Sequence, residues 1–222
     1  MPSKPNILII GPSGSGKTCS LEGMFTKYAP DIAFIDTERK GLPFLFDRSK
    51  LCLDLECADY KSAQDAMTKA KASPAKFIVY DSLSKYFDWL GSYCDTAYKG
   101  YDIWKNYGIG VGNCFEFNKS TGKTVVAIMH DEIVYVEQPG GGRVSRIRAA
   151  TKGNMWEGKI EKEWLIVLVT MVATKDGKTN FSLATITDGV HPAKVPKWLG
   201  LPAAIPNDLS PVIDKLVEAI LV

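Results

Sequence analysis

Short apolar segments alternate with amphipathic segments through the first 130 residues. Continuous apolar runs predict buried strands at residues 6–10 (NILII), 32–36 (IAFID), 76–81 (KFIVYD) and 124–129 (TVVAIM), with a shorter one at 51–55. Residues 60–72 have helical spacing of small apolar side chains, and a second helix is expected after residue 81, through Phe87 and Leu90. Buried strands that alternate with helices predict an α/β fold with a mostly parallel central sheet flanked by helices.

The pattern changes after residue 130. Residues 133–137 and 164–173 predict strands with no long helix between them, and Asp176-Gly177 predicts a hairpin turn. We therefore expect residues 131–222 to form an antiparallel extension of the sheet, a loop and a C-terminal helix. That helix is predicted to begin with Ser210 as its N-cap and Pro211 in its first turn. Since no linker or repeat is visible, we expect one domain over residues 1–222, with its core at 1–130.

Composition and charge narrow the function classes only slightly. Lys and Arg number 27 and Asp and Glu number 25, so any basic site has to be local. No apolar run reaches the roughly 18 residues of a membrane span, and the first ten residues do not resemble a signal peptide, so we expect no membrane partner. The five cysteines are scattered without a CxxC pair, and there are two histidines. This argues against structural zinc and predicts reduced thiols in a cytoplasmic protein.

The segment GPSGSGKT at residues 11–18 fits the phosphate-binding pattern G-x-x-x-x-G-K-[ST]. It follows a predicted strand and precedes a helix expected from Lys17 to about Lys27. Glycines let backbone N–H groups approach phosphates closely, and the helix presents its positive end. Lys17 is expected to bind the β and γ phosphates and Thr18 to ligate Mg²⁺. We predict that ATP is bound by Gly11, Pro12, Ser13, Gly14, Ser15, Gly16, Lys17, Thr18 and Cys19.

A carboxylate for the metal is expected at Asp81, which ends the apolar run Phe77–Tyr80 and can hold Mg²⁺ through water. Alternatively, Asp81 caps the next helix. Ser82 follows within reach of the γ-phosphate region. The phosphate-binding loop alone also suits guanylate kinases and ABC-type ATPases. However, the chain lacks an LSGGQ-like signature, and residues 40–125 contain one arginine where a nucleotide kinase needs an arginine-rich lid.

Residues 32–40 (IAFIDTERK), 78–82 (IVYDS) and 125–130 (VVAIMH), together with the phosphate-binding loop, resemble RecA-like ATPases. The resemblance implies a RecA-like P-loop core that hydrolyses ATP with Mg²⁺. It implies that Glu38 activates the attacking water and that His130, where the family commonly has Gln, senses the γ-phosphate. Alternatively, Glu38 is a solvated loop carboxylate and His130 is a core histidine. The chain further resembles small phage-encoded RecA-core ATPases, some of which assist single-strand annealing, in its length and in residues 157–164 and 192–196.

Candidate surfaces for single-stranded DNA lie in the middle of the chain. Residues 139–156 hold four basic residues and no acidic one, and Gly140–Gly142 make their start flexible; the basic residues are Arg143, Arg146, Arg148 and Lys152. In RecA-like proteins the loop at this place binds single-stranded DNA. A solvated hairpin and an arginine finger for a neighbouring subunit are alternatives. A stretch of aromatic residues can stack bases or pack as a helix face: Tyr93, Tyr98, Tyr101, Trp104 and Tyr107.

The resemblance also implies a homo-oligomer, either a filament or a ring. In it, Lys194 and Lys197 complete the ATP site of the neighbouring subunit. Alternatively, these two lysines lie on a solvated loop. Together these features predict an ATPase that acts on single-stranded DNA in phage recombination or annealing, in the host cytoplasm, with a single-strand-binding protein as a further partner. Two other functions stay open. One is a nucleotide-dependent switch that binds a protein partner, and the other is a small-molecule kinase.

Overall fold

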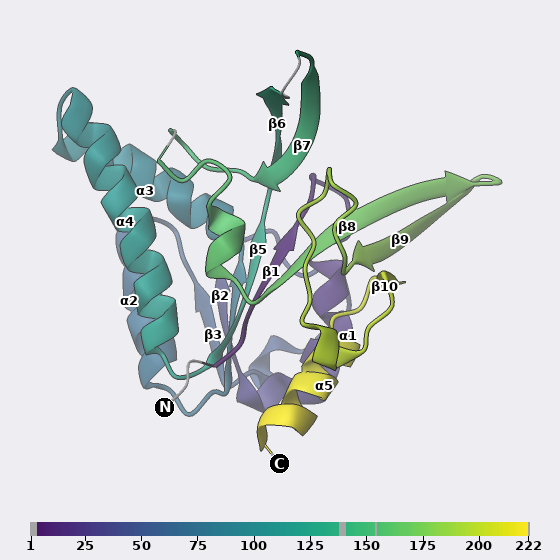
Figure 1. Ribbon diagram of the computed structural model, residues 1–222. Helices are drawn as coiled ribbons and strands as arrows, with labels where there is room; N and C mark the ends of the chain where they lie inside the picture. Colours follow the sequence, from purple (N-terminus) through teal and green to yellow (C-terminus); the bar gives the residue numbers. More distant parts are fainter. Residues whose placement is uncertain (1–3, 138–140, 154, 222) are drawn as a thin grey trace.

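A computed structural model describes residues 4–137, 141–153 and 155–221, which form an eight-stranded sheet, helices on both of its faces, and a separate hairpin (Figure 1). The strands of the sheet lie in the order β10-β9-β8-β1-β5-β4-β2-β3. Neighbours from β8 to β3 pair in parallel, whereas β8, β9 and β10 pair antiparallel. The predicted fold class, a mostly parallel α/β sheet with an antiparallel C-terminal extension, is therefore confirmed.

The element bounds follow the apolar pattern closely. The parallel strands are β1 (Asn6–Ile10), β2 (Ile32–Asp36), β3 (Leu53–Glu56), β4 (Phe77–Asp81), β5 (Thr124–Met129) and β8 (Ile166–Lys175). The antiparallel strands of the sheet are β9 (Lys178–Ala184) and β10 (Ala204–Pro206). The helices are α1 (Glu22–Tyr28), α2 (Tyr60–Ala72), α3 (Leu83–Ala97), α4 (Tyr101–Ser120) and α5 (Ser210–Leu221). Among the described residues, none of these helices combines the length and apolar character needed to cross a membrane.

Each face of the sheet has its own core, because alternate side chains of a strand point to opposite faces. Leu8 and Ile10 of β1 pack in the cluster built with α2, α3 and α4, and Ile7 and Ile9 pack in the cluster built with α1 and α5. Figure 1 shows these two helix groups on opposite sides of the strands. Strands buried on both faces explain the continuous apolar runs in the sequence.

The topology brings four strand ends to one edge. Parallel strands share a direction, so the residues that follow β1, β2, β4 and β5 lie at the same edge of the sheet, where ligands of open α/β sheets bind. These residues are Gly11, Thr37, Ser82 and His130. β1 lies between β5 and β8, both of which come much later in the chain. The phosphate-binding loop is thus next to strand ends from both halves of the sequence.

The chain departs from the prediction after His130. Residues 133–137 do not extend the sheet, so that prediction is wrong, and the segment with the arginines forms the hairpin that stood as the alternative to a loop. In the part of the chain that the structure describes, β6 (Asp131–Glu137) and β7 (Arg143–Ala149) form a two-stranded sheet of their own, and this hairpin projects beyond the eight-stranded sheet (Figure 1). Val144 and Ile147 lie opposite Val136 and Ile133, and such β-branched cross-strand pairs stabilise a hairpin despite the neighbouring arginines. Residues 138–140, including Gly140, and residue 154 lie outside the described residues.

Two helix starts also differ from the prediction. The segment after the phosphate-binding loop begins as a 3₁₀ turn, Cys19–Leu21, before α1 starts at Glu22. Ser210 is not the side-chain cap of α5. Its N–H and hydroxyl both donate to the Asp208 carboxylate, at 2.8 and 2.7 Å from Oδ1. A carboxylate is a stronger acceptor than a hydroxyl, which explains why Asp208 takes this role.

Candidate functional site

A cavity of about 300 Å³ opens at the carboxyl edge of the sheet. The phosphate-binding loop lines one side, and residues that follow β2, β4 and β5 line the other. The lining includes the predicted residues Ser13, Gly14, Gly16, Lys17, Thr18 and Cys19, as well as Glu38, Asp81, Ser82 and His130. Side chains from four separate stretches of the sequence therefore meet in one pocket.

The phosphate-binding loop has the shape of an anion cradle. Gly14 and Gly16 have φ angles of 77° and 87°, a region that favours glycine. Among the described residues, the N–H groups of Gly14, Gly16 and Lys17 have no protein acceptor. The Lys17 ammonium fills the loop interior and donates to the carbonyls of Gly11 and Pro12, at 2.7 Å each. Burial lowers the pKa of Lys17, while Asp131 and Asp81 oppose that shift. The loop thus has donors available for phosphate oxygens.

Three of the predicted loop residues support the cradle from behind. Ser15 donates to the Pro12 carbonyl at 2.7 Å, and Thr170 on β8 donates to Ser15 at 2.6 Å. A Cβ added to Gly11 would lie 1.8 Å from Thr170 Oγ1, so glycine is required for β8 to approach. Gly11, Pro12 and Ser15 therefore fix the loop and do not line the cavity. Thr170 lies 155 residues from Ser15 and belongs to no motif, so sequence patterns could not predict this contact.

Thr18 and Asp81 form a pair of hard oxygen donors. Thr18 Oγ1 donates to Asp81 Oδ2 at 2.9 Å. The Thr18 oxygen keeps a lone pair for Mg²⁺, and Asp81 beside it would hold the ion through water, so the pair fits a magnesium site. Burial raises the pKa of Asp81 to about 6, with Asp36 and Glu38 adding to the rise and Thr18 opposing it. A cation would favour the ionised form of this carboxylate.

The metal would need ligands beyond the protein. Among the described residues, no cluster of three or more His, Cys, Asp or Glu side chains is arranged to hold an ion. Mg²⁺ is commonly held by one or two protein groups together with waters and substrate phosphates. The residues present therefore fit a magnesium–nucleotide complex better than a resident metal ion.

Glu38 is positioned by a junction between two strand ends. The N–H groups of Thr37 and Glu38 donate to the Asp81 carbonyl at 2.9 and 3.2 Å, and the Thr37 hydroxyl donates to the Ser82 carbonyl at 2.8 Å. Ser82 Oγ then donates to Glu38 Oε1 at 2.9 Å. Burial alone would raise the pKa of Glu38, but hydrogen bonds from Lys40 and Ser82 outweigh it and the pKa is lowered. Glu38 is therefore an ionised carboxylate beside Asp81.

His130 lies opposite Glu38, with Nε2 4.0 Å from Glu38 Oε1. Its backbone N–H donates to Ser84 Oγ of α3 at 2.9 Å, and its carbonyl accepts from the Ala150 N–H at 2.9 Å. Burial lowers the pKa of His130, and the neighbouring Lys17 lowers it further. A neutral imidazole at the cavity wall can donate one hydrogen bond to a phosphate oxygen.

The C-terminal half contributes residues that the sequence analysis missed. Asn207, just after β10, lines the cavity and donates to the Gly16 carbonyl at 2.9 Å. Phe181 of β9 lines the same side. Neither belongs to a motif, and each reaches the cavity only because β8, β9 and β10 extend the sheet beside β1. No pattern in the sequence could have found them.

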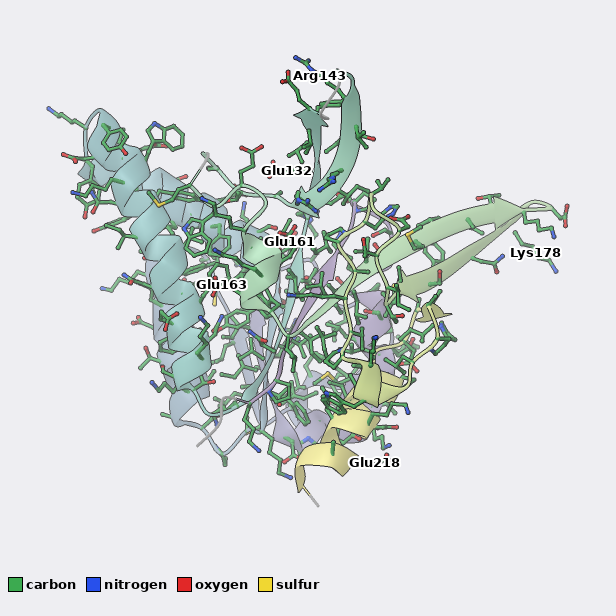
Figure 2. All side chains as sticks on the ribbon, viewed as in Figure 1. Glu132, Arg143, Glu161, Glu163, Lys178 and Glu218 are labelled. Atoms are coloured by element: carbon green, nitrogen blue, oxygen red, sulfur yellow. The ribbon has the colours of Figure 1, made fainter. Side chains whose placement is uncertain are left out.

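The four basic residues proposed for DNA binding do not form one cluster. Figure 2 shows Arg143 at the far end of the β6–β7 hairpin, and it lies 3.6 Å from Glu137. Arg146 and Arg148 are on the other face of β7, because strand residues alternate between faces. Lys152 lies beyond the hairpin, with Nζ 3.5 Å from Asp88 of α3. None of the four lines the nucleotide cavity.

Lys194 and Lys197 also lie away from the cavity of their own chain. The backbone of Lys194 pairs with Val167, near the start of β8, through hydrogen bonds of 2.8 and 2.9 Å. Burial lowers the pKa of Lys194. Lys197 is exposed and begins a 3₁₀ turn, Lys197–Leu199. A role at an ATP site would therefore require a neighbouring subunit.

Comparison with known proteins places the chain in a family. No curated protein matches it. The flagellar accessory protein FlaH from Methanocaldococcus jannaschii is similar in structure, with a TM-score of 0.47 and 13% sequence identity over 89% of this chain and 84% of that chain. A family model described as an AAA domain matches residues 3–194. That match spans most of the 222 residues and includes every wall of the cavity except Asn207, so the chain belongs to this AAA-domain family.

Proposed function

We propose that this protein is a Mg²⁺-dependent ATPase that acts on single-stranded DNA in phage recombination or annealing. Family membership indicates nucleotide binding and hydrolysis. The observation that carries the ATPase is the meeting of Lys17, the Thr18–Asp81 pair and Glu38 in one cavity. The DNA role rests on the resemblance of residues 78–82 and 125–130 to RecA-like proteins and on the basic hairpin that follows His130.

Each cavity residue has a distinct role in this proposal. When ATP binds, Lys17 donates to the β and γ phosphates in place of the carbonyls of Gly11 and Pro12. Thr18 would ligate Mg²⁺ with a lone pair of Oγ1 while its O–H still donates to Asp81 Oδ2, which is possible because a hydroxyl both donates and accepts. The metal, when bound, neutralises charge that develops on the phosphates. Glu38 orients the attacking water, and His130 reports the γ-phosphate through its hydrogen bond.

Substitution of Thr18 tests the magnesium part. Thr18→Val keeps the shape of the side chain and removes the oxygen, whereas Thr18→Ser keeps the oxygen. We expect Mg²⁺-dependent hydrolysis to be lost in Thr18→Val and retained in Thr18→Ser, measured as phosphate release over a magnesium titration. Wild-type hydrolysis by Thr18→Val would rule out the proposed metal site.

The hairpin is proposed to contact the phosphate backbone of DNA through Arg143, Arg146 and Arg148. Each phosphate contact to a single strand contributes about 0.7 to the slope of log affinity against log salt. Replacing all three arginines by alanine should therefore lower that slope by up to about 2 and weaken binding at moderate salt. Unchanged binding would remove the hairpin from the DNA-binding surface.

We also propose that the protein works as a filament or ring in which Lys194 and Lys197 reach the neighbour's ATP, with a single-strand-binding protein as a further partner. In such an assembly, ATP hydrolysis per chain should rise with protein concentration. The double variant Lys194→Ala/Lys197→Ala should lose that rise while keeping the oligomer in light scattering. Hydrolysis per chain that is independent of concentration would contradict the shared site.

A second function is favoured by one observation on the hairpin. Ile133 and Tyr135 of β6 are 61% and 69% exposed. Exposed apolar side chains of this kind are common where a protein partner binds. A nucleotide-dependent switch for a protein partner would share every cavity residue, and it would hydrolyse ATP at a rate that does not respond to DNA.

A further inference from the structure

A second cavity, of about 630 Å³, lies between α4 and the segment that follows β7. Its lining includes Tyr101, Trp104 and Lys105 from α4, and Lys152 and Met155 from the segment after β7. The aromatic stretch and the basic segment are separate features of the sequence. The fold brings them into one pocket, away from the nucleotide cavity.

The segment after β7 is fixed to α4 by three contacts. The Tyr107 hydroxyl accepts from the Lys152 N–H at 3.2 Å. Trp156 Nε1 donates to the Gly108 carbonyl at 2.8 Å. Met155 lies directly over Gly108, where an added Cβ would be 2.0 Å from Met155 Sδ. The pocket is therefore preformed, so a ligand would not need to order it.

The aromatic residues of this stretch divide into two roles. Tyr107 is 2% exposed and supports the packing just described. Tyr101 and Trp104 are 77% and 49% exposed and lie one helical turn apart on the same side of α4. Trp104 rests against Gly153, where an added Cβ would come within 2.9 Å of Trp104 Cε3. Two neighbouring aromatic faces are thus held at the surface with room beside them.

The charge of the pocket is positive. Lys105 and Lys152 line it, and among the described residues no acidic side chain does. The Lys152 stem crosses α3 at Gly91, where an added Cβ would be 3.0 Å from Lys152 Cδ. Its ammonium lies 3.5 Å from Asp88, and both side chains are well exposed, at 44% and 57%. Such exposed pairs are weak, so a phosphate can compete for Lys152.

We propose that this pocket binds single-stranded nucleic acid, with bases stacked on Trp104 and Tyr101 and phosphates paired with Lys105 and Lys152. Alternating aromatic faces and lysines, without carboxylates, match the recurring chemistry of single-strand binding. The inference rests on the proposed function, since it names the surface on which that DNA binds. It also assigns Lys152 to this pocket and separates it from the arginines of β7.

The pocket is connected to the nucleotide cavity through the backbone. Ala150, two residues before Lys152, donates its N–H to the His130 carbonyl at 2.9 Å. His130 in turn lines the nucleotide cavity. Nucleic acid bound by Lys152 would therefore be linked to the strand end that carries His130 through the hydrogen bond between Ala150 and His130. This predicts that the pocket contributes to any stimulation of ATP hydrolysis by DNA.

The test is fluorescence anisotropy of a fluorescein-labelled oligo(dT) strand with the full chain, Mg²⁺ and a non-hydrolysable ATP analogue. Stacking of one base contributes about 1–3 kcal/mol, so Trp104→Ala should weaken binding by about 5- to 150-fold. Trp104→Phe keeps an aromatic face and should stay within a few-fold of wild type. Trp198→Ala is the matched control, because Trp198 is also exposed, at 58%, and lies outside this pocket.

A second variant tests whether a loss of binding comes from the pocket or from misfolding. Lys105→Glu changes an exposed side chain and should weaken binding strongly at low salt without changing the melting temperature. If the wild type binds the strand and both Trp104→Ala and Lys105→Glu bind it equally well, the pocket is wrong and the DNA function stands. If the wild type binds no single strand at all, the DNA function and the pocket fail together. A protein captured by the pocket in place of DNA would also overturn the inference.

Discussion

Replacement of Glu38 by Gln separates catalysis from folding in this site. The substitution keeps the size of the side chain and an oxygen that can still accept from Ser82 Oγ, which lies 2.9 Å from Oε1. It removes the negative charge that the lowered pKa of Glu38 keeps at neutral pH. An amide cannot act as a base for the attacking water, so turnover should fall while the cavity keeps its shape.

The expected effect of this substitution on the rate is much larger than its expected effect on stability. A positioned general base contributes about 10²- to 10⁴-fold to a rate, which corresponds to about 3–5.5 kcal/mol of transition-state stabilisation. The main interaction lost on the folding side is the ion pair with Lys40, whose side chain is 76% exposed. Exposed pairs contribute at most about 1 kcal/mol, which is about 2–4 °C in melting temperature for a chain of this size.

The assay combines phosphate release with binding of a fluorescent ATP analogue and a thermal melt. Glu38→Gln should lose at least about 100-fold in kcat, bind the analogue within a few-fold of wild type, and melt within a few degrees of it. Lys40→Gln is the matched control: it breaks the same ion pair and leaves the carboxylate, so its kcat should change little. Normal hydrolysis by Glu38→Gln would refute the assignment of Glu38.

Three further predictions follow from the cavity. Burial raises the pKa of Asp81 from 3.8 to about 6, so between those pH values the metal-free folded protein binds one more proton than the unfolded chain. The stability that this proton contributes is fully present below about pH 4 and is lost as pH rises through about 6. Asp81→Asn should remove this pH dependence in thermal melts and stabilise the metal-free protein at pH 7 by up to about 3 kcal/mol; a less stable variant at pH 7 would contradict it. In the wild type, hydrolysis at limiting Mg²⁺ should fall below about pH 6, since protons then compete with the metal for Asp81, and a flat profile would oppose this. Gly11→Ala should lower stability by about 1–3 kcal/mol through the clash with Thr170 Oγ1, and Thr170→Ala in the same chain should recover part of that loss; additive losses in a double-mutant cycle would contradict the clash.

The sequence predicted the elements whose patterns are local. β1, β2, β5 and α2 have the predicted bounds, because a strand buried on both faces reads as a continuous apolar run and a helix shows its own period. The turn at Asp176-Gly177 separates β8 from β9 as predicted. The phosphate-binding loop, Glu38, Asp81 and His130 could be proposed from the sequence because each lies at the end of such a strand or within two residues of it, and the parallel sheet brings those ends together.

What the sequence did not predict depends on contacts between distant segments. β7 looked like a charged loop, since its strand character comes from pairing with β6 and not from its own composition. Thr170, Phe181 and Asn207 reach the nucleotide cavity only through the order of the sheet, in which β8 lies beside β1. Trp104 and Lys152 likewise line one pocket only because the segment after β7 lies along α4.

Steady-state ATP hydrolysis with Mg²⁺, measured with and without single-stranded DNA, tests the central claim most directly. Lys17→Ala is the control, because it removes the ammonium that would bind the phosphates and leaves the rest of the cavity in place. We predict hydrolysis by the wild type that single-stranded DNA stimulates, and neither hydrolysis nor stimulation in Lys17→Ala. Hydrolysis that is equal in the two proteins would contradict the ATPase site, and wild-type hydrolysis that ignores DNA would contradict its proposed substrate.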